Sequence, residues 1–145
     1  MGEGKNAEQM TVLVVEPGYA PYEKTIPHDV DAMQKIVGGW ITAIYPYKEP
    51  VGIVANDDGL LLGMEFNRSI EGGYGGLVGP FFVCGLTADS FCSLPPDQME
   101  RFKKRFHKAE ILVGFRGSEP VTLKVKPKQK VLKSEKQRQP PSQER

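Results

Sequence analysis

Residues 11–26 read TVLVVEPGYAPYEKTI, and this stretch predicts the kind of sheet that the chain builds. Residues 11–15 are a short β-branched run, which is typical of a buried strand, and residues 16–18 end that run in a turn. Residues 22–26 alternate apolar and polar side chains, as a half-exposed strand does. Because a short connection joins antiparallel neighbours, we predict that these two strands form a β-hairpin.

Two segments carry the signals of helix ends. Asp29 is placed to cap a helix that runs to about Val37, and Gly38 follows where a left-handed C-terminal cap is needed. Residues 93–97 (SLPPD) open a second helix, since proline is tolerated in a first turn and Asp97 complements the positive end of the helix dipole. The spacing of its apolar residues predicts one buried stripe, formed by Met99, Phe102 and Phe106.

The middle of the chain is rich in strand patterns. Residues 40–47 (WITAIYPY) are aromatic and β-branched, with Pro46 limiting them to an edge or a bulge. Residues 51–55 predict a further strand. Residues 56–59 (NDDG) predict a hairpin turn in which Gly59 takes a positive φ, so that residues 60–62 (LLL) return as its second strand.

The second half of the pattern is less regular. Residues 63–70 are ambiguous between strand and loop, and the glycine-rich residues 71–76 predict a flexible loop. Residues 77–86 (LVGPFFVCGL) predict one strand that is kinked at Gly79 and Pro80. Residues 111–115 (ILVGF) predict either one more strand or an arm packed on the body, and alternating apolar residues at 121, 123 and 125 leave a terminal strand open.

Taken in order, these elements predict an α+β fold, a mostly antiparallel sheet with the two helices packed on one side of it. We expect a flexible lead-in over residues 1–9, a single domain over residues 10–122, and a disordered basic tail over residues 123–145. The tail holds eight Lys or Arg against two Glu, whereas residues 1–122 hold eleven against sixteen Asp or Glu. The mildly acidic body argues against a nucleic-acid-binding face spread over it.

Sequence patterns that are missing narrow the expected compartment and chemistry of the protein. Two cysteines are too few for a disulfide framework, and no apolar leader or run of ~20 apolar residues is visible, so we expect a cytoplasmic protein without a membrane segment. No cofactor is predicted. A zinc site is not predicted either, because Cys84, Cys92, His28 and His107 lack the close pairing of structural sites. No catalytic constellation is visible, so the sequence favours a protein that is not an enzyme.

The sharpest polar feature is Asn67-Arg68, next to a glycine-rich loop. A guanidinium there could hold a carboxylate or phosphate bidentately, with the Asn67 amide orienting it. The alternative is an internal ion pair with a glutamate, for which the candidates are Glu16, Glu23 and Glu65. The loop does not fit the spacing of a phosphate-binding loop. The hypothetical ligand-facing rim consists of Asn67, Arg68, Gly73, Tyr74 and Gly75.

Two further binding hypotheses concern the tail and the aromatic strand. The tail could bind nucleic-acid phosphates, although it lacks aromatic side chains for stacking on bases, and a merely solubilising tail is the alternative. The lysines concerned are Lys124, Lys126, Lys128 and Lys130. Trp40, Tyr45 and Tyr47 on a predicted edge strand leave a homodimer open.

Several short motifs together resemble an uncharacterised family, a domain of unknown function found in small proteins of bacterial mobile elements and phages. The resemblance spans about residues 10–106. The motifs are residues 11–18 (TVLVVEPG), 21–26 (PYEKTI), 36–41 (IVGGWI), 43–46 (AIYP), 56–59 (NDDG), 67–68 (NR) and 79–85 (GPFFVCG).

The resemblance supplies no activity, cofactor or catalytic residue, but it implies a setting in which small binders, inhibitors and regulators are common. Our first hypothesis is therefore a non-enzymatic accessory protein that binds a host or element-encoded protein. The alternatives are a nucleotide or acidic-metabolite binder that uses Arg68 and residues 72–76, and a weak nucleic-acid binder that uses the tail.

Overall fold

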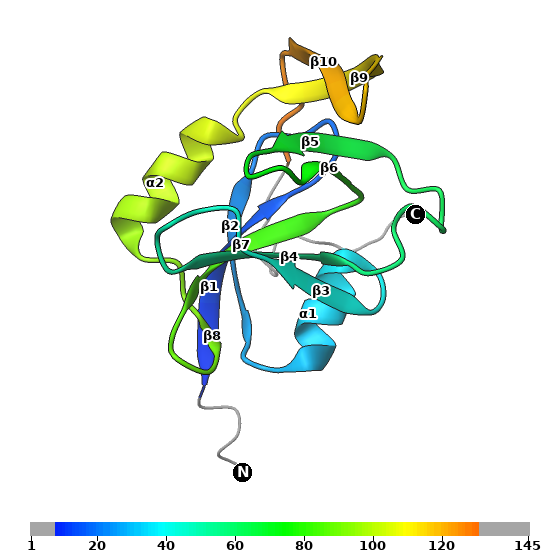
Figure 1. The fold of residues 1–145 in the computed structure, drawn as a ribbon. Helices are drawn as coiled ribbons and strands as arrows, with labels where there is room; N and C mark the ends of the chain where they lie inside the picture. The colour runs from blue at the N-terminus through cyan, green and yellow to red at the C-terminus, as the bar shows by residue number, and fades with distance from the viewer. Residues whose placement is uncertain (1–7, 131–145) are drawn as a thin grey trace, which may run out of the picture.

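The computed structural model describes residues 8–130, and its centre is a six-stranded antiparallel sheet in the order β2-β1-β7-β4-β3, with β8 paired to β7 (Figure 1). Two smaller two-stranded sheets and two helices complete the described part, so the predicted α+β class with a mostly antiparallel sheet is confirmed. The elements are β1 (Gln9–Val15), β2 (Tyr22–Pro27), α1 (Val30–Val37), β3 (Ile41–Ile44), β4 (Val51–Asn56), β5 (Phe66–Ile70), β6 (Gly75–Val78), β7 (Phe81–Leu86), β8 (Phe91–Cys92), α2 (Pro96–Arg105), β9 (Ala109–Arg116) and β10 (Glu119–Val125).

Local signals predicted the first hairpin and α1 correctly. Strands β1 and β2 pair antiparallel, with Met10 opposite Ile26. The Asp29 carboxylate accepts a hydrogen bond from the Ala32 N–H at 2.8 Å, which satisfies one of the free donors at the start of α1. Gly38 ends the helix with φ 84°, a left-handed conformation that costs glycine nothing.

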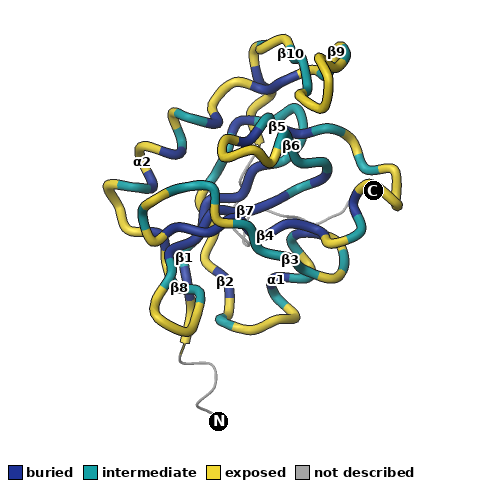
Figure 2. The backbone as a smooth tube through the Cα atoms, viewed as in Figure 1, coloured by how far each residue is buried: buried dark blue, intermediate teal, exposed yellow. Residues whose placement is uncertain are grey.

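The two helices lie on opposite faces of the sheet, so the prediction that both pack on one side is wrong. Alternate residues of β1 belong to two separate cores: Val12 and Val14 pack with Met33 and Val37 of α1, and Leu13 packs with the residues of α2. The α2 side of the sheet is also covered by Ile70 of β5 and Leu77 of β6. Because both faces are covered, the central strands are buried along most of their length (Figure 2).

The predicted hairpin after β4 is also wrong. Strand β4 pairs with β3 and β7, and Leu60–Leu62 lie in exposed turns. The side-chain oxygen of Asn56 accepts the Asp58 N–H at 2.7 Å, and the Leu62 N–H then donates to the Asp58 carbonyl at 2.9 Å. These bonds wind the chain into successive turns, and the residue with positive φ is Gly63 rather than Gly59. The return strand is β5, in another sheet.

The predicted strand over residues 77–86 is two strands of different sheets. Residues 77–78 belong to β6, which pairs with β5, whereas β7 lies in the central sheet between β1 and β4. The chain breaks at Gly79, which has φ 75° and donates its N–H to the Glu65 carbonyl at 2.7 Å. A Cβ at Gly79 would also clash with Met64, so only glycine fits this crossing between the sheets.

Beyond α2, strands β9 and β10 form a hairpin, and the ordered chain continues past it. Strand β10 includes residues 123–125, which the sequence analysis assigned to the tail. Lys128 then pairs with the loop after β1, donating its N–H to the Gly18 carbonyl and accepting the Ala20 N–H, each at 2.9 Å. Residues 1–7 and 131–145 lie outside the described residues, so the predicted disorder of the lead-in and of the tail's end stays a prediction.

Candidate functional site

Arg68 is fully buried, and all its donors are used inside the protein. Its Nε and Nη2 both donate to the Phe106 carbonyl, at 3.2 and 2.8 Å, and Nη2 also reaches the Tyr19 carbonyl at 2.7 Å. Nη1 donates to the side-chain and main-chain oxygens of Asn67, at 2.8 and 3.4 Å. Five N–H groups thus meet backbone or amide oxygens, instead of the glutamates that the ion-pair hypothesis named.

Asn67 is also fully buried and belongs to the same hydrogen-bond network as Arg68. We call this network the Arg68 bracket. Its amide nitrogen donates to the Val15 carbonyl at 2.9 Å and to the Gly79 carbonyl at 2.8 Å. The two side chains therefore tie β5 to the end of β1, to the break before β7 and to the end of α2. Neither has a surface to offer a ligand.

The charge of Arg68 is retained despite its burial. Burial lowers the pKa of Arg68 to about 10, while the negative charge of Glu110 acts in the opposite direction. The guanidinium is still protonated near neutral pH. Its main acceptor, the Phe106 carbonyl, lies at the C-terminal end of α2, where the helix dipole favours a positive charge.

The other three predicted site residues lie at the far end of the β5–β6 hairpin. Gly73 and Gly75 have positive φ in the turn, and Tyr74 between them is exposed. The Tyr74 hydroxyl accepts the Tyr45 N–H at 3.4 Å, and the Gly75 Cα lies beside Pro120. The structure therefore brings Asn67 and Arg68 together but does not join them to the glycine loop, and the hypothetical ligand rim is not one site.

A carboxylate that sequence reasoning missed lies beside the Arg68 bracket. The Glu110 side chain is buried at the base of β9, where Oε1 accepts hydrogen bonds from the Ser69 N–H and the Thr122 hydroxyl, each at 3.0 Å. Oε2 has no hydrogen-bond partner and lies 3.6 Å from Nζ of Lys124. Burial acts to raise the pKa of Glu110, but these hydrogen bonds and the lysine charge outweigh it and lower the pKa.

Glu110 should make the free energy of unfolding depend on pH in the acidic range. Because its pKa is lower in the folded chain than the ordinary value of 4.5, its contribution is present above pH ~4.5 and is lost as the pH falls through the folded pKa. We expect the wild type to lose more free energy of unfolding between about pH 6 and pH 3 than Glu110→Gln does. Urea unfolding at a series of pH values measures this difference, and parallel curves for the two proteins would contradict it.

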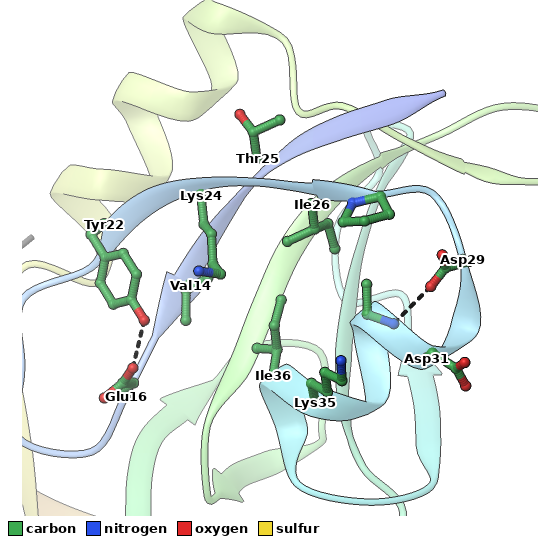
Figure 3. A pocket seen from close by; sticks show the side chains of 12 residues that line it. Val14, Glu16, Tyr22, Lys24, Thr25, Ile26, Asp29, Asp31, Lys35 and Ile36 are labelled. Carbon is green, nitrogen blue, oxygen red and sulfur yellow. Dashed lines mark hydrogen bonds between the residues drawn. The ribbon is translucent and has the colours of Figure 1, made fainter. Parts of the chain in front are cut away.

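A groove of about 690 Å³ lies between β2 and α1 (Figure 3). Val14, Ile26 and Ile36 form its apolar part, and Lys24 and Lys35 stand at its rim. The Tyr22 hydroxyl donates to Glu16 at 2.6 Å, and burial together with this bond raises the pKa of Tyr22. Tyr22 is thus held protonated. Among the residues that line the groove, no base or nucleophile lies beside a group that would activate it.

The possible metal ligands of the described residues are not gathered in one place, and one of the two cysteines is buried. Among residues 8–130, no three His, Cys, Asp or Glu side chains are grouped to hold a metal ion. Burial raises the pKa of the Cys84 thiol to about 12, which makes it a small core hydrophobe instead of a nucleophile. No helix within the same residues is long and apolar enough to cross a membrane.

The β9–β10 hairpin carries several large apolar residues that are exposed, and Figure 2 shows exposed stretches along both of its strands. Leu123 of β10 lies opposite Ile111 in the register and Pro120 lies opposite Phe115, with a register shift at Val113 between the two pairs. Four large apolar residues of the hairpin are each between 51% and 65% exposed. We call these four residues the hairpin face: Ile111, Val113, Phe115 and Leu123.

The charges around the hairpin face are mainly positive. Lys108, Arg116, Lys124 and Lys126 are exposed around the hairpin, against one exposed carboxylate, Glu119. The two following lysines pack on the body instead: Lys128 and Lys130 place Nζ 5.4 and 5.2 Å from the Tyr19 ring, and Lys130 pairs with Glu16 at 2.9 Å. Lys128 and Lys130 are thus held against the fold, whereas Lys124 and Lys126 are exposed on the hairpin side.

Comparison with known proteins gives a family but no activity. The family model described as Domain of unknown function (DUF3846) matches residues 10–107, which is the range over which the resemblance was expected. No curated relative and no solved structure matches the chain. The family match stops before β9, so the hairpin face lies outside it.

Proposed function

We propose a protein-binding function for this chain, which belongs to the family described as Domain of unknown function (DUF3846). On this proposal, the chain is a cytoplasmic, non-enzymatic accessory protein of a bacterial mobile element or phage. It binds a host or element-encoded protein. The observation that supports the proposal best is the hairpin face. Four large apolar residues of this two-stranded sheet are exposed to water.

Such a face is costly for an isolated chain. Each Å² of apolar surface left in water forgoes roughly 25 cal/mol, and a two-stranded sheet is marginally stable without a layer packed on it. The inner side of the hairpin is anchored through Glu110, whose carboxylate binds Ser69 of β5. The outer side has no such layer among the described residues. Contiguous apolar surface of this kind marks a protein-binding site.

The rim defines the chemistry of the partner. Positive side chains at both ends of the hairpin, Lys108 and Arg116, favour a partner with an apolar centre and acidic edges, because complementary charge steers encounter and fixes orientation. A planar strand face of this type fits a strand or helix face of another protein better than a small molecule, which needs a concave site.

Co-purification from cells that naturally carry the gene tests the proposal. The variant is Ile111→Thr/Val113→Thr/Phe115→Thr, which removes apolar surface but keeps residues suited to a strand. The matched control is Val30→Thr on α1, since Val30 is 53% exposed and Val113 is 55% exposed.

We expect one protein to be recovered in stoichiometric amount with the wild type and with Val30→Thr, and to be lost with the triple variant. Recovery of no stoichiometric protein, or equal recovery with the triple variant, would contradict the proposal. Thermal unfolding of all three proteins verifies that the variants are folded.

A further inference from the structure

We infer that a second copy of this chain binds the hairpin face, through an acidic apolar surface on the loop between β4 and β5. We call this the loop surface, and its residues are Asp57, Asp58, Leu60, Leu61, Leu62 and Glu65. The inference rests on the proposed function in one respect, that the hairpin face binds protein. It adds a specific occupant.

The loop surface is presented by hydrogen-bonded turns. The Asp57 N–H donates to the Trp40 carbonyl at 2.8 Å, which joins the loop to the segment before β3, and the Met64 N–H donates to the Gly59 carbonyl at 3.0 Å. With the backbone held in this way, the leucine side chains are turned outward: Leu60 and Leu61 are 84% and 86% exposed, and Trp40 is 71% exposed. Exposed leucines on a hydrogen-bonded loop are typical of a binding surface.

A groove runs beside the loop surface. It has a volume of about 440 Å³ and lies between residues 56–61 of the loop and residues 76–78 of β6. Leu60, Leu61, Leu77 and Val78 give it apolar walls, and Asp57 and Asp58 give it an acidic edge. It is therefore a concave apolar site that can receive an exposed aromatic side chain such as Phe115.

The two surfaces are complementary in charge. Asp57 and Glu65 are exposed and Asp58 is half-buried, and residues 49–67 contain no lysine or arginine. Around the hairpin face the exposed charges are mainly basic, with Lys108 and Arg116 at its two ends. Each surface thus offers an apolar centre, and the rims carry opposite signs, which is the arrangement that matches two copies to each other.

Within one copy the two surfaces cannot cover each other. Strand β6 separates them, with Gly75 at one end beside Pro120 of the hairpin and Val78 at the other end in the groove. Figure 1 shows the β9–β10 hairpin at the top of the molecule and the loop between β4 and β5 at its right edge. The exposed fractions confirm that both surfaces are open in the single chain. A second copy is therefore the protein of known chemistry that fits both.

Charge exchange tests this inference on the full chain. The loop variant is Asp57→Lys/Asp58→Lys, the hairpin variant is Lys108→Glu/Arg116→Glu, and the combined variant carries all four substitutions. Lys124 is left unchanged because it faces the buried Glu110. Sedimentation velocity over a concentration series measures how strongly each protein self-associates. A further variant, Leu60→Ser/Leu61→Ser, removes apolar surface without changing charge.

We expect the wild type to self-associate. In the loop variant and in the hairpin variant, the dissociation constant of self-association should rise about tenfold or more. The combined variant should regain the wild-type constant within about threefold, because exchanging both signs restores complementarity. Leu60→Ser/Leu61→Ser should lose association while its circular dichroism stays native. A wild type that is monomeric at its highest soluble concentration, or a combined variant no stronger than the two partial ones, would overturn the inference.

Failure here and failure of the proposed function are distinguishable. A monomeric wild type that still co-purifies a partner through the hairpin face overturns self-association alone. A self-associating protein that recovers no other protein from its cells overturns the proposed partner and leaves the second copy in place.

Discussion

Replacing Arg68 with alanine is expected to lower the free energy of unfolding by about 3–5 kcal/mol, or to prevent folding altogether. The substitution would remove the Arg68 donors from the buried Phe106 carbonyl and from the partly buried Tyr19 carbonyl, and would open a cavity where a fully buried side chain now lies. Unpaired buried carbonyls and a cavity each destabilise a fold, and here they coincide.

Denaturant unfolding measures the loss, with two further variants as references. Arg116→Ala removes an exposed arginine and should change stability by no more than about 0.5 kcal/mol. Arg68→Lys keeps the charge but cannot form the forked contacts with two carbonyls, so its loss should fall between the other two. An Arg68→Ala protein as stable as Arg116→Ala would show that the bracket between β5 and α2 does not hold the fold.

Phe82→Ala is the second substitution with a large expected effect, a loss of about 3–5 kcal/mol in the free energy of unfolding. Phe82 lies on the α1 side of β7 and is fully buried with Met33 and Val37. If both helices packed on the other face, this side chain would be in water and its truncation would cost little. The result therefore tests whether the two helices cover opposite faces of the sheet, as well as the packing of Phe82 itself.

The natural comparison is Phe115→Ala, because Phe115 is the same residue type but lies on the uncovered hairpin face. Its truncation should change stability by about 0.5 kcal/mol or less. Equal losses for the two phenylalanines in chemical denaturation would contradict the burial of the α1 face. A small loss for Phe115 also establishes that binding defects of hairpin variants do not arise from unfolding.

Signals that act within a few residues predicted local structure well. Asp29 and Gly38 mark the ends of α1 because capping depends on bonds to neighbours in sequence. The stripe of α2 and the β1–β2 hairpin were predicted for the same reason. The domain's boundary was harder to predict, because β10 and Lys128 are ordered by contacts with β9 and with the loop after β1.

Features set by distant segments were mispredicted. Residues 11–15 and residues 51–55 are apolar without alternation, which is typical of strands covered on both faces, yet both helices were assigned to one face. At Asn56 the turn chemistry was real, but its side chain closes a local turn instead of a hairpin. The next strand joins another sheet, a choice that no neighbouring residue encodes.

The candidate sites show the same division. The importance of Arg68 was evident from the sequence, but its carbonyl partners come from residues 49 and 38 positions away, so their convergence could not be read from spacing. Residues 111–115 were predicted to be either one more strand or an arm packed on the body, and they form most of β9. That these residues are exposed is shown only by the structure, in which Glu110 anchors the base of the hairpin to Ser69 of β5.

Site-specific photo-crosslinking inside cells that carry the gene tests the central claim most directly. A photoreactive phenylalanine analogue at position 115 places the probe on the hairpin face, and the same analogue at position 22 places it in the groove between β2 and α1. The account predicts a discrete protein adduct from position 115, and none of matching yield from position 22. An unreacted position 115, or a strong adduct from position 22 alone, would contradict the assignment of the hairpin face as the binding surface.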